Sequence, residues 1–220
     1  MSSPNSELCR LYLISPPVFD LHAFSCQLSL ALKGGDVACL QLRLKGVNDS
    51  EIRTASARLI PICKDHGVAF LINDRPDLAV DVGADGVHVG ASDASYEEAR
   101  RLVGEDAIVG VSCYNARHLA MVAGEDGADY VAFGAFFPTS TKQPRVRAKP
   151  ELLTWWHTTT TVPCVAIGGI SAENCGALVR AGADFLAVIS GIWSNPDGPE
   201  NAVSAFNEKI KRHSHAMINA

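Results

Sequence analysis

Apolar residues along the chain gather into eight short runs, separated by longer stretches in which apolar and polar residues mix. The runs are rich in Val, Ile, Leu and Ala, which is typical of parallel strands buried on both faces. The intervening stretches include amphipathic helical patterns, as at 49–66 and 199–212. We therefore predict alternating strands and helices with parallel pairing and right-handed crossovers. The runs are LYLIS, VACLQLRL, VAFLIND, GVHVG, AIVGVSC, YVAFGAF, VPCVAIGG and FLAVISGI.

A short sequence repeat marks four of the boundaries between helix-like and strand-like stretches. Gly-Gly-Asp or Gly-Ala-Asp occurs at 34–36, 83–85, 127–129 and 182–184, each time between a helix-like and a strand-like stretch. Glycine suits the left-handed position that ends a helix. The copies are about 45–55 residues apart, which leaves room for two strand–helix units each.

Eight such units in 220 residues predict the α/β class and a single (βα)8 TIM barrel. We expect one domain over 1–220, with loose tails at 1–8 and 214–220. An open doubly wound sheet is the alternative fold. It is disfavoured because no Gly-x-Gly-x-x-Gly follows the first strand.

Composition narrows the partners and the compartment. The formal net charge is −5, and the charged residues, 20% of the chain, form no basic block, so we expect neither a nucleic-acid nor a membrane partner. The first residues do not resemble a signal peptide, and no apolar stretch approaches the length of a membrane span. Seven cysteines without a Cys-x-x-Cys pair favour a reduced, cytoplasmic protein.

Polar residues concentrate where the predicted strands end. In a (βα)8 barrel this edge and the loops after it form the site. The candidates, in chain order, are Gln41, Arg43, Lys45, Asn73, Asp74, Asp93, Ser112, Thr139, Ser140, Thr141, Lys142, Gly168, Gly169, Ile189 and Ser190.

Their chemistry indicates phosphate esters. Cations at 43, 45 and 142 converge with Asp74 and Asp93, and Mg²⁺ is usually bound by one or two carboxylates plus phosphate oxygens. Loops after the seventh and eighth strands of a barrel commonly hold phosphate, and Gly168 and Gly169 allow a ligand to approach the backbone. Two phosphate sites in one barrel mouth suggest that two phosphorylated substrates are joined.

Structural interpretations compete with these functional ones. Arg43 and Lys45 could be solvated charges at a strand end, although their spacing places both on one face with Gln41. Asp74 could be a turn residue before a helix that starts near Pro76. Asp93 could cap the next helix, but Ser-x-x-Glu at 95–98 already fits a capping box.

Two further residues favour a structural interpretation. His88 points away from the face of its strand that carries the flanking valines, and we expect a structural rather than a catalytic histidine there. Cys113 has no histidine partner in its motif, so a thiol nucleophile is not expected.

Several of these segments together resemble thiamine-phosphate synthases, in that family's order and near its spacing. They are QLRLK, INDRPDLA, ADGVHVGASD, VGVSC, GADYVAFGAFFPTSTK, AIGGIS and GADFLAVIS, and the likeness spans about 11–212. The resemblance implies a (βα)8 barrel. It also implies Mg²⁺-dependent coupling of 4-amino-5-hydroxymethyl-2-methylpyrimidine diphosphate to 5-(2-hydroxyethyl)-4-methylthiazole phosphate, which yields thiamine phosphate and diphosphate.

The resemblance also implies a role for each matching position. Asp74 and Asp93 would bind Mg²⁺. The pyrimidine diphosphate would be held by Gln41, Arg43, Lys45, Asn73, Ser112 and Lys142, of which Arg43, Lys45, Ser112 and Lys142 would also act in catalysis. The thiazole phosphate would be held by Thr139, Ser140, Thr141, Gly169, Ile189 and Ser190.

The chain departs from the family pattern at three positions. Ala91 replaces a usual Gln, Leu44 a frequent Glu, and Tyr114 a frequent His. Two rivals stay open: a thiazole tautomerase, which should use a His near Ser112, and a non-catalytic barrel that binds thiamine phosphates. A homo-oligomer also stays open as an assembly.

Overall fold

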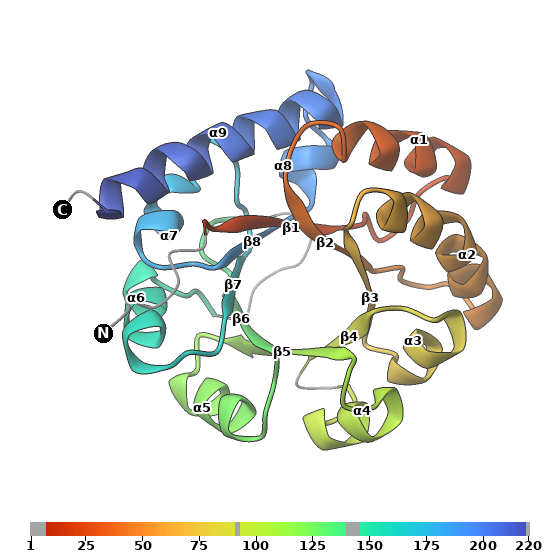
Figure 1. The fold of residues 1–220 in the computed structure, drawn as a ribbon, viewed down its shortest axis with the longest axis horizontal. Coiled ribbons are helices and arrows are strands. Elements are labelled where there is room, and N and C mark those ends of the chain that lie inside the picture. The colour runs from red at the N-terminus through yellow and green to blue at the C-terminus, as the bar shows by residue number, and fades with distance from the viewer. Residues whose placement is uncertain (1–7, 91–92, 140–145, 219–220) are drawn as a thin grey trace.

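The computed structural model describes residues 8–90, 93–139 and 146–218, with side chains up to residue 214. Within them, parallel strands ring the centre and helices surround them (Figure 1). The strands are β1 (Arg10–Ile14), β2 (Val37–Leu42), β3 (Ala69–Asn73), β4 (Gly86–Val89), β5 (Ile108–Tyr114), β6 (Tyr130–Gly134), β7 (Cys164–Ile167) and β8 (Phe185–Val188). The helices are α1 (Leu21–Ala31), α2 (Asp49–Asp65), α3 (Pro76–Val82), α4 (Tyr96–Val103), α5 (Arg117–Glu125), α6 (Pro150–Thr159), α7 (Gly176–Arg180), α8 (Ser190–Trp193) and α9 (Gly198–Ile218).

The sheet closes on itself. Each described strand pairs in parallel with the next, and β8 pairs with β1, where Leu11 lies opposite Leu186. Closure removes both edges of the sheet, so no open switch point exists as in a doubly wound fold. The predicted (βα)8 barrel is confirmed. All eight predicted strands are present within the described residues.

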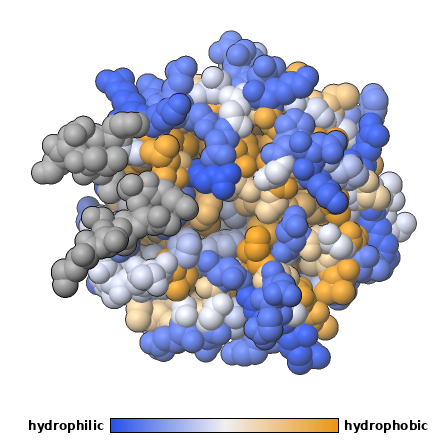
Figure 2. Space-filling view, viewed as in Figure 1, coloured by the Kyte–Doolittle hydropathy of each residue, from blue (hydrophilic) through white to orange (hydrophobic). Residues whose placement is uncertain are grey.

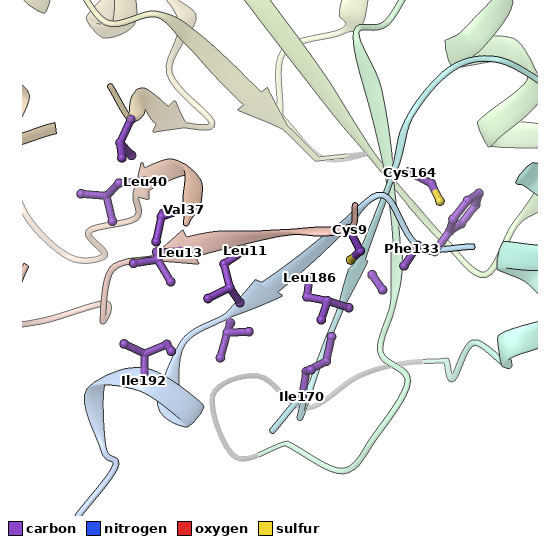
Figure 3. Close-up of a cluster of buried hydrophobic side chains, with 14 of the residues drawn as sticks. Cys9, Leu11, Leu13, Val37, Leu40, Phe133, Cys164, Ile170, Leu186 and Ile192 are labelled. Carbon is purple, nitrogen blue, oxygen red and sulfur yellow. The ribbon is translucent and has the colours of Figure 1, made fainter. Parts of the chain in front are cut away.

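Apolar side chains fill two layers. The larger one lies between the strands and the helices; Figure 3 shows Leu11 of β1 beside Leu186 of β8, and Leu13 of β1 beside Val37 of β2. The smaller one fills the barrel interior and includes Tyr12. Strand residues are therefore buried on both faces, which explains why the eight runs do not alternate with polar residues. Figure 2 shows the hydrophilic residues crowding the periphery, over the helices.

The Gly-Ala-Asp repeat has a structural cause at both ends. Gly83 ends α3 in the left-handed conformation, with φ 67°. The aspartates of three copies accept a hydrogen bond from a backbone N–H of the preceding strand, and so tie neighbouring strands together. These bonds join Asp85 to Phe70 (2.7 Å), Asp129 to Val109 (2.8 Å) and Asp184 to Cys164 (2.7 Å).

The C-terminal segment differs from the prediction. Helix α9 continues to Ile218, so the backbone of 214–218 is helical and not a loose tail. No Gly or Pro follows residue 199 before that point, so the sequence contains no residue that would stop the helix. Among the described residues, no helix combines the length and the hydropathy needed to cross a membrane.

Candidate active site

A cavity of about 740 Å³ opens at the carboxyl ends of the strands. Each predicted site residue that the structure describes lines it: Gln41, Arg43, Lys45, Asn73, Asp74, Asp93, Ser112, Thr139, Gly169, Ile189 and Ser190. Ser140, Thr141 and Lys142 lie outside the described residues, as does Ala91. The barrel thus brings together side chains from six of its strand ends, and their chemical roles stay predictions.

Four ionisable side chains, Arg43, Lys45, Asp74 and Asp93, form what we call the charged rim. The Lys45 ammonium lies 2.6 Å from Asp74 Oδ2, and its side chain is 49% exposed. The backbone of this segment is anchored, because the Arg43 N–H donates to Ser15 Oγ at 2.9 Å. Both cations follow the end of β2, so their charges face the cavity and not the barrel interior.

The two carboxylates of the charged rim lie close together. Asp74 has a positive φ of 65°, and its N–H donates to the His88 carbonyl at 2.8 Å. Burial raises the pKa of Asp93, and its hydrogen bond with Asp74 raises that pKa further. Burial opposes ionisation of Asp74 as well, but hydrogen bonds with Lys45 and Asp93 lower its pKa. A hydrogen bond between two carboxyl groups needs a shared proton, and these opposite shifts place it on Asp93, with the negative charge on Asp74 beside the Lys45 ammonium.

Asp93 is not the cap of α4. The Ser95 hydroxyl takes that position and accepts from the Glu98 N–H at 3.2 Å, as the sequence predicts. The Asp93 carboxylate instead accepts from the Gly90 N–H at 3.0 Å, which turns it back toward the end of β4. Asp93 is therefore available to the cavity.

Below the charged rim lies what we call the hydroxyl network: Tyr12, Tyr130, His88 and Ser112. The two tyrosine hydroxyls are 2.8 Å apart, and the Tyr130 hydroxyl lies 3.0 Å from His88 Nδ1. His88 Nε2 lies 2.8 Å from Ser112 Oγ. Burial lowers the pKa of His88 to about 4, so the ring is neutral near pH 7. Burial also raises the pKa of both tyrosines, which stay protonated.

The prediction of a structural histidine describes only part of the environment of His88. The residue lies inside the barrel at 9% exposure, as expected of a structural histidine, but its ring also contacts Ser112, which is predicted to bind substrate. Tyr12 and Tyr130 were not predicted as cavity residues. The available signal is the period of two along β1 and β6, since residues that alternate with outward-facing ones point into the barrel.

Tyr114 also lines the cavity. It has a φ of 54°, and the pairing of β5 with β6 shifts register between Ser112 and Tyr114. Such irregularities often re-aim a side chain beside a functional site. A Cβ placed on Gly90 would lie 2.7 Å from Asp93 Oδ2 and 4.0 Å from the Tyr114 hydroxyl, so both groups approach the same part of the wall.

The opposite wall is built from backbone. Gly168 and Gly169 follow β7 with φ values of 103° and 64°, which favour glycine. A Cβ on Gly169 would lie 2.2 Å from the Pro138 carbonyl oxygen, so this position has no space for a side chain. The wall continues through Ile189 and Ser190 after β8.

A closed (βα)8 barrel whose cavity carries cations, paired carboxylates and a glycine-lined wall at the carboxyl ends of its strands defines a barrel protein suited to phosphorylated ligands. A sequence model of the family described as thiamine monophosphate synthase matches residues 11–192. The chain belongs to this family.

Individual relatives agree with that assignment. A thiamine-phosphate synthase of Rhodospirillum centenum is 61% identical over 203 residues, which span 92% of this chain and 98% of that protein. One of Hyphomonas neptunium is 52% identical, with 90% and 92% covered. The solved structure of thiamine phosphate pyrophosphorylase from Pyrococcus furiosus superposes with a TM-score of 0.81 at 28% identity, covering 93% of this chain and 96% of that one.

Proposed function

We propose that this family member is the transferase that couples 4-amino-5-hydroxymethyl-2-methylpyrimidine diphosphate to 5-(2-hydroxyethyl)-4-methylthiazole phosphate, releasing thiamine phosphate and diphosphate. One observation carries the proposal: a single cavity places the charged rim opposite a backbone wall built from Gly168 and Gly169. The charged rim suits a diphosphate with a metal ion, and the glycine wall suits a second, smaller phosphate.

Asp74 and Asp93 fit Mg²⁺. Their carboxyl groups are close enough to share a hydrogen bond, and both face a cavity rather than a closed cage. Mg²⁺ is usually held by one or two carboxylates and completes its shell with water and phosphate oxygens, so two carboxyl groups are sufficient. When bound, Mg²⁺ would supply positive charge where the diphosphate departs.

The residues of this chain would promote loss of diphosphate by electrostatics. The C–O bond would break and its electron pair leave with the diphosphate, and Arg43, Lys45 and, from the sequence prediction, Lys142 would stabilise the negative charge that develops on its oxygens. The Ser112 hydroxyl would contact the same group. Gln41 and Asn73, at the ends of β2 and β3, would hold the pyrimidine. No protein nucleophile is required.

The second half of the reaction needs orientation only. The thiazole nitrogen attacks the pyrimidine methylene cation, and a C–N bond replaces the C–O bond. Thr139, Ser140, Thr141, Gly169, Ile189 and Ser190 would hold the thiazole phosphate. Placing both substrates in one cavity of about 740 Å³ gives the proximity that this step requires.

Two rivals make different predictions. A thiazole tautomerase should carry an acid–base His near Ser112, but Tyr114 occupies that place in the sequence, and the imidazole that hydrogen-bonds Ser112 is that of the buried His88. A non-catalytic barrel would bind both substrates and release nothing. The paired carboxylates of the charged rim favour the synthase over both.

One assay separates the three functions. Purified protein, Mg²⁺ and both substrates are mixed, and thiamine phosphate and diphosphate are measured together. The synthase yields equal amounts of the two products. Binding of both substrates without product would overturn the proposal in favour of the non-catalytic barrel, and tautomerisation of the thiazole without coupling would support the other rival.

The proposal also covers the cellular compartment and the binding partners. Six of the seven cysteines are buried and all are unpaired, which supports a reducing, cytoplasmic location. The ligands proposed are the two small phosphorylated molecules, and a homo-oligomer is the assembly still to be measured.

A further inference from the structure

The hydroxyl network is a continuous line of hydrogen bonds that begins deep in the barrel. Tyr12 and Tyr130 are 3% and 6% exposed, among the aliphatic side chains of the inner layer. The line passes through the ring of His88 and ends at Ser112, which lines the cavity. Each link is 2.8–3.0 Å long, within the normal range.

The protons in this line fall into two classes of arrangement, set by which nitrogen of His88 carries hydrogen. His88 is buried, and both ring nitrogens face hydroxyl groups rather than carboxylates, so its surroundings suit the neutral ring with one N–H. That N–H is on either Nδ1 or Nε2. Because each hydroxyl has one proton to donate, the choice at His88 decides which end of the line keeps a proton that has no acceptor within it.

In the first class, Nδ1 carries the proton. It donates to the Tyr130 oxygen, and the single hydrogen bond between the two tyrosines then uses only one of their two protons. The other tyrosine proton, whichever hydroxyl donates, is left without an acceptor among the side chains that the structure describes. A buried O–H without an acceptor is unfavourable. In this class the Ser112 proton also points back to Nε2, away from the cavity.

In the second class, Nε2 carries the proton. Tyr12 donates to Tyr130, Tyr130 donates to Nδ1, and Nε2–H donates to Ser112 Oγ. Every buried proton then has an acceptor. The Ser112 oxygen has received its hydrogen bond from inside the protein, so its own O–H is directed into the cavity.

We propose that Tyr130 and His88 are positioning residues that hold the Ser112 hydroxyl as a hydrogen-bond donor toward the cavity. This inference rests on the proposed function, in which Ser112 meets the diphosphate. Diphosphate oxygens only accept, so a serine locked as an acceptor would repel them, whereas a serine locked as a donor binds them without first reorienting. The sequence pattern of the family motifs contains no indication of this direction.

The tautomer can be measured directly on the ligand-free protein. Imidazole ¹⁵N chemical shifts distinguish a nitrogen that carries hydrogen from one that does not, and a spectrum of His88→Gln identifies the His88 signals among the seven histidines. At pH 7.5 we expect the proton on Nε2. A proton on Nδ1, or a charged ring, would overturn the inference whatever the activity of the protein.

Two tyrosine variants provide a matched pair. Tyr130→Phe removes the acceptor or donor at Nδ1, so the tautomer loses its bias; we expect kcat/KM for the pyrimidine diphosphate to fall about threefold to tenfold. Tyr12→Phe removes the same atom from the same layer, but Tyr130 still donates to Nδ1. We therefore expect Tyr12→Phe to stay within about twofold of wild type, with the proton still on Nε2. Equal losses in the two variants would contradict the directional network.

A double-mutant cycle tests whether Tyr130 acts through Ser112. In a Ser112→Ala background the Tyr130→Phe change should have no further effect, because the group that it orients is gone. Additive losses would mean that Tyr130 merely supports the barrel. If the ¹⁵N spectrum shows the Nε2 tautomer and yet no thiamine phosphate forms, the proposed function fails while the assigned direction of the network stands.

Discussion

The charged rim and the hydroxyl network occupy the same cavity but differ in their electrostatics. In the charged rim, Lys45 is about half exposed and Asp74 about one-fifth exposed, and the ions partly neutralise one another. In the hydroxyl network, Tyr12, Tyr130 and His88 are buried, and each polar atom has a neutral partner. The charged groups of the rim can still form ion pairs with a ligand. In the network, the directions of the hydrogen bonds are fixed before a ligand binds.

This difference separates two contributions to catalysis. Charges near solvent are screened, so they act strongly only when the substrate displaces water. Neutral hydrogen bonds in a low-dielectric interior are hard to rearrange, so they preorganise a single group. We therefore expect changes in the charged rim to alter transition-state stabilisation most, and changes in the network to alter orientation and stability.

Metal removal should have the largest effect, because it leaves the rim carboxylates uncompensated. Chelation with EDTA should lower coupling roughly 1,000-fold or more, and added Mg²⁺ should restore it. Asp74→Asn and Asp93→Asn should reproduce the loss, whereas Asp65→Asn, exposed at the end of α2, should not. Turnover at the wild-type rate in EDTA would contradict the proposal that the charged rim binds a catalytic metal ion.

Protonation of His88 should destabilise the fold as pH falls. The pKa is about 4 in the native state and about 6.5 when unfolded, so the unfolded state binds more protons between those values. The stability contributed by the neutral ring is complete above about pH 6.5 and is lost progressively down to about pH 4, in total about 3 kcal/mol. Urea unfolding at several pH values measures it. His88→Gln should remove this part of the pH dependence; an unchanged profile would show that the ring is not neutral and buried.

Removal of one rim cation should have the next largest effect. Lys45→Ala deletes a charge-assisted contact to the departing diphosphate and leaves Asp74 without its partner, so kcat/KM should fall about 10- to 150-fold, or about 1.5–3 kcal/mol. Lys142→Ala should behave alike. The control is Lys64→Ala, exposed on α2 and away from the cavity. Wild-type turnover by Lys45→Ala or Lys142→Ala would count against the role of that residue.

Tyr114 lines the same cavity as the two regions and should show the smallest effect. Tyr114→Phe keeps the ring and the strained backbone position but removes the hydroxyl near Asp93, so we expect about a fivefold loss in kcat/KM, or about 1 kcal/mol. Tyr114→His introduces the residue that is frequent in the family, and its kcat/KM should lie between those of Tyr114→Phe and the wild type. If Tyr114→Phe has no effect while Lys45→Ala does, the boundary of the charged rim stops short of Tyr114.

Much of the site was predictable because it depends on strand ends. Arg43, Lys45 and Asp74 were predicted to meet because the carboxyl ends of parallel strands lie together in any closed barrel. The cap at Ser95 was predictable from local sequence, which left Asp93 available to the cavity. The repeated aspartates are visible in the sequence as part of a helix-ending motif. Their hydrogen bonds to the preceding strand were not predictable, because they depend on which strands are neighbours.

The fold, the family and the charged residues were all predictable before folding was considered, because they follow from short-range patterns: the spacing of apolar residues, helix stops and motifs. The line of hydrogen bonds from Tyr12 through Tyr130 and His88 to Ser112 exists only in the folded barrel. These residues come from four strands, and Tyr12 and Tyr130 are 118 positions apart. Hydrogen bonds require atoms within about 3 Å, and barrel closure rather than local sequence brings them to that distance.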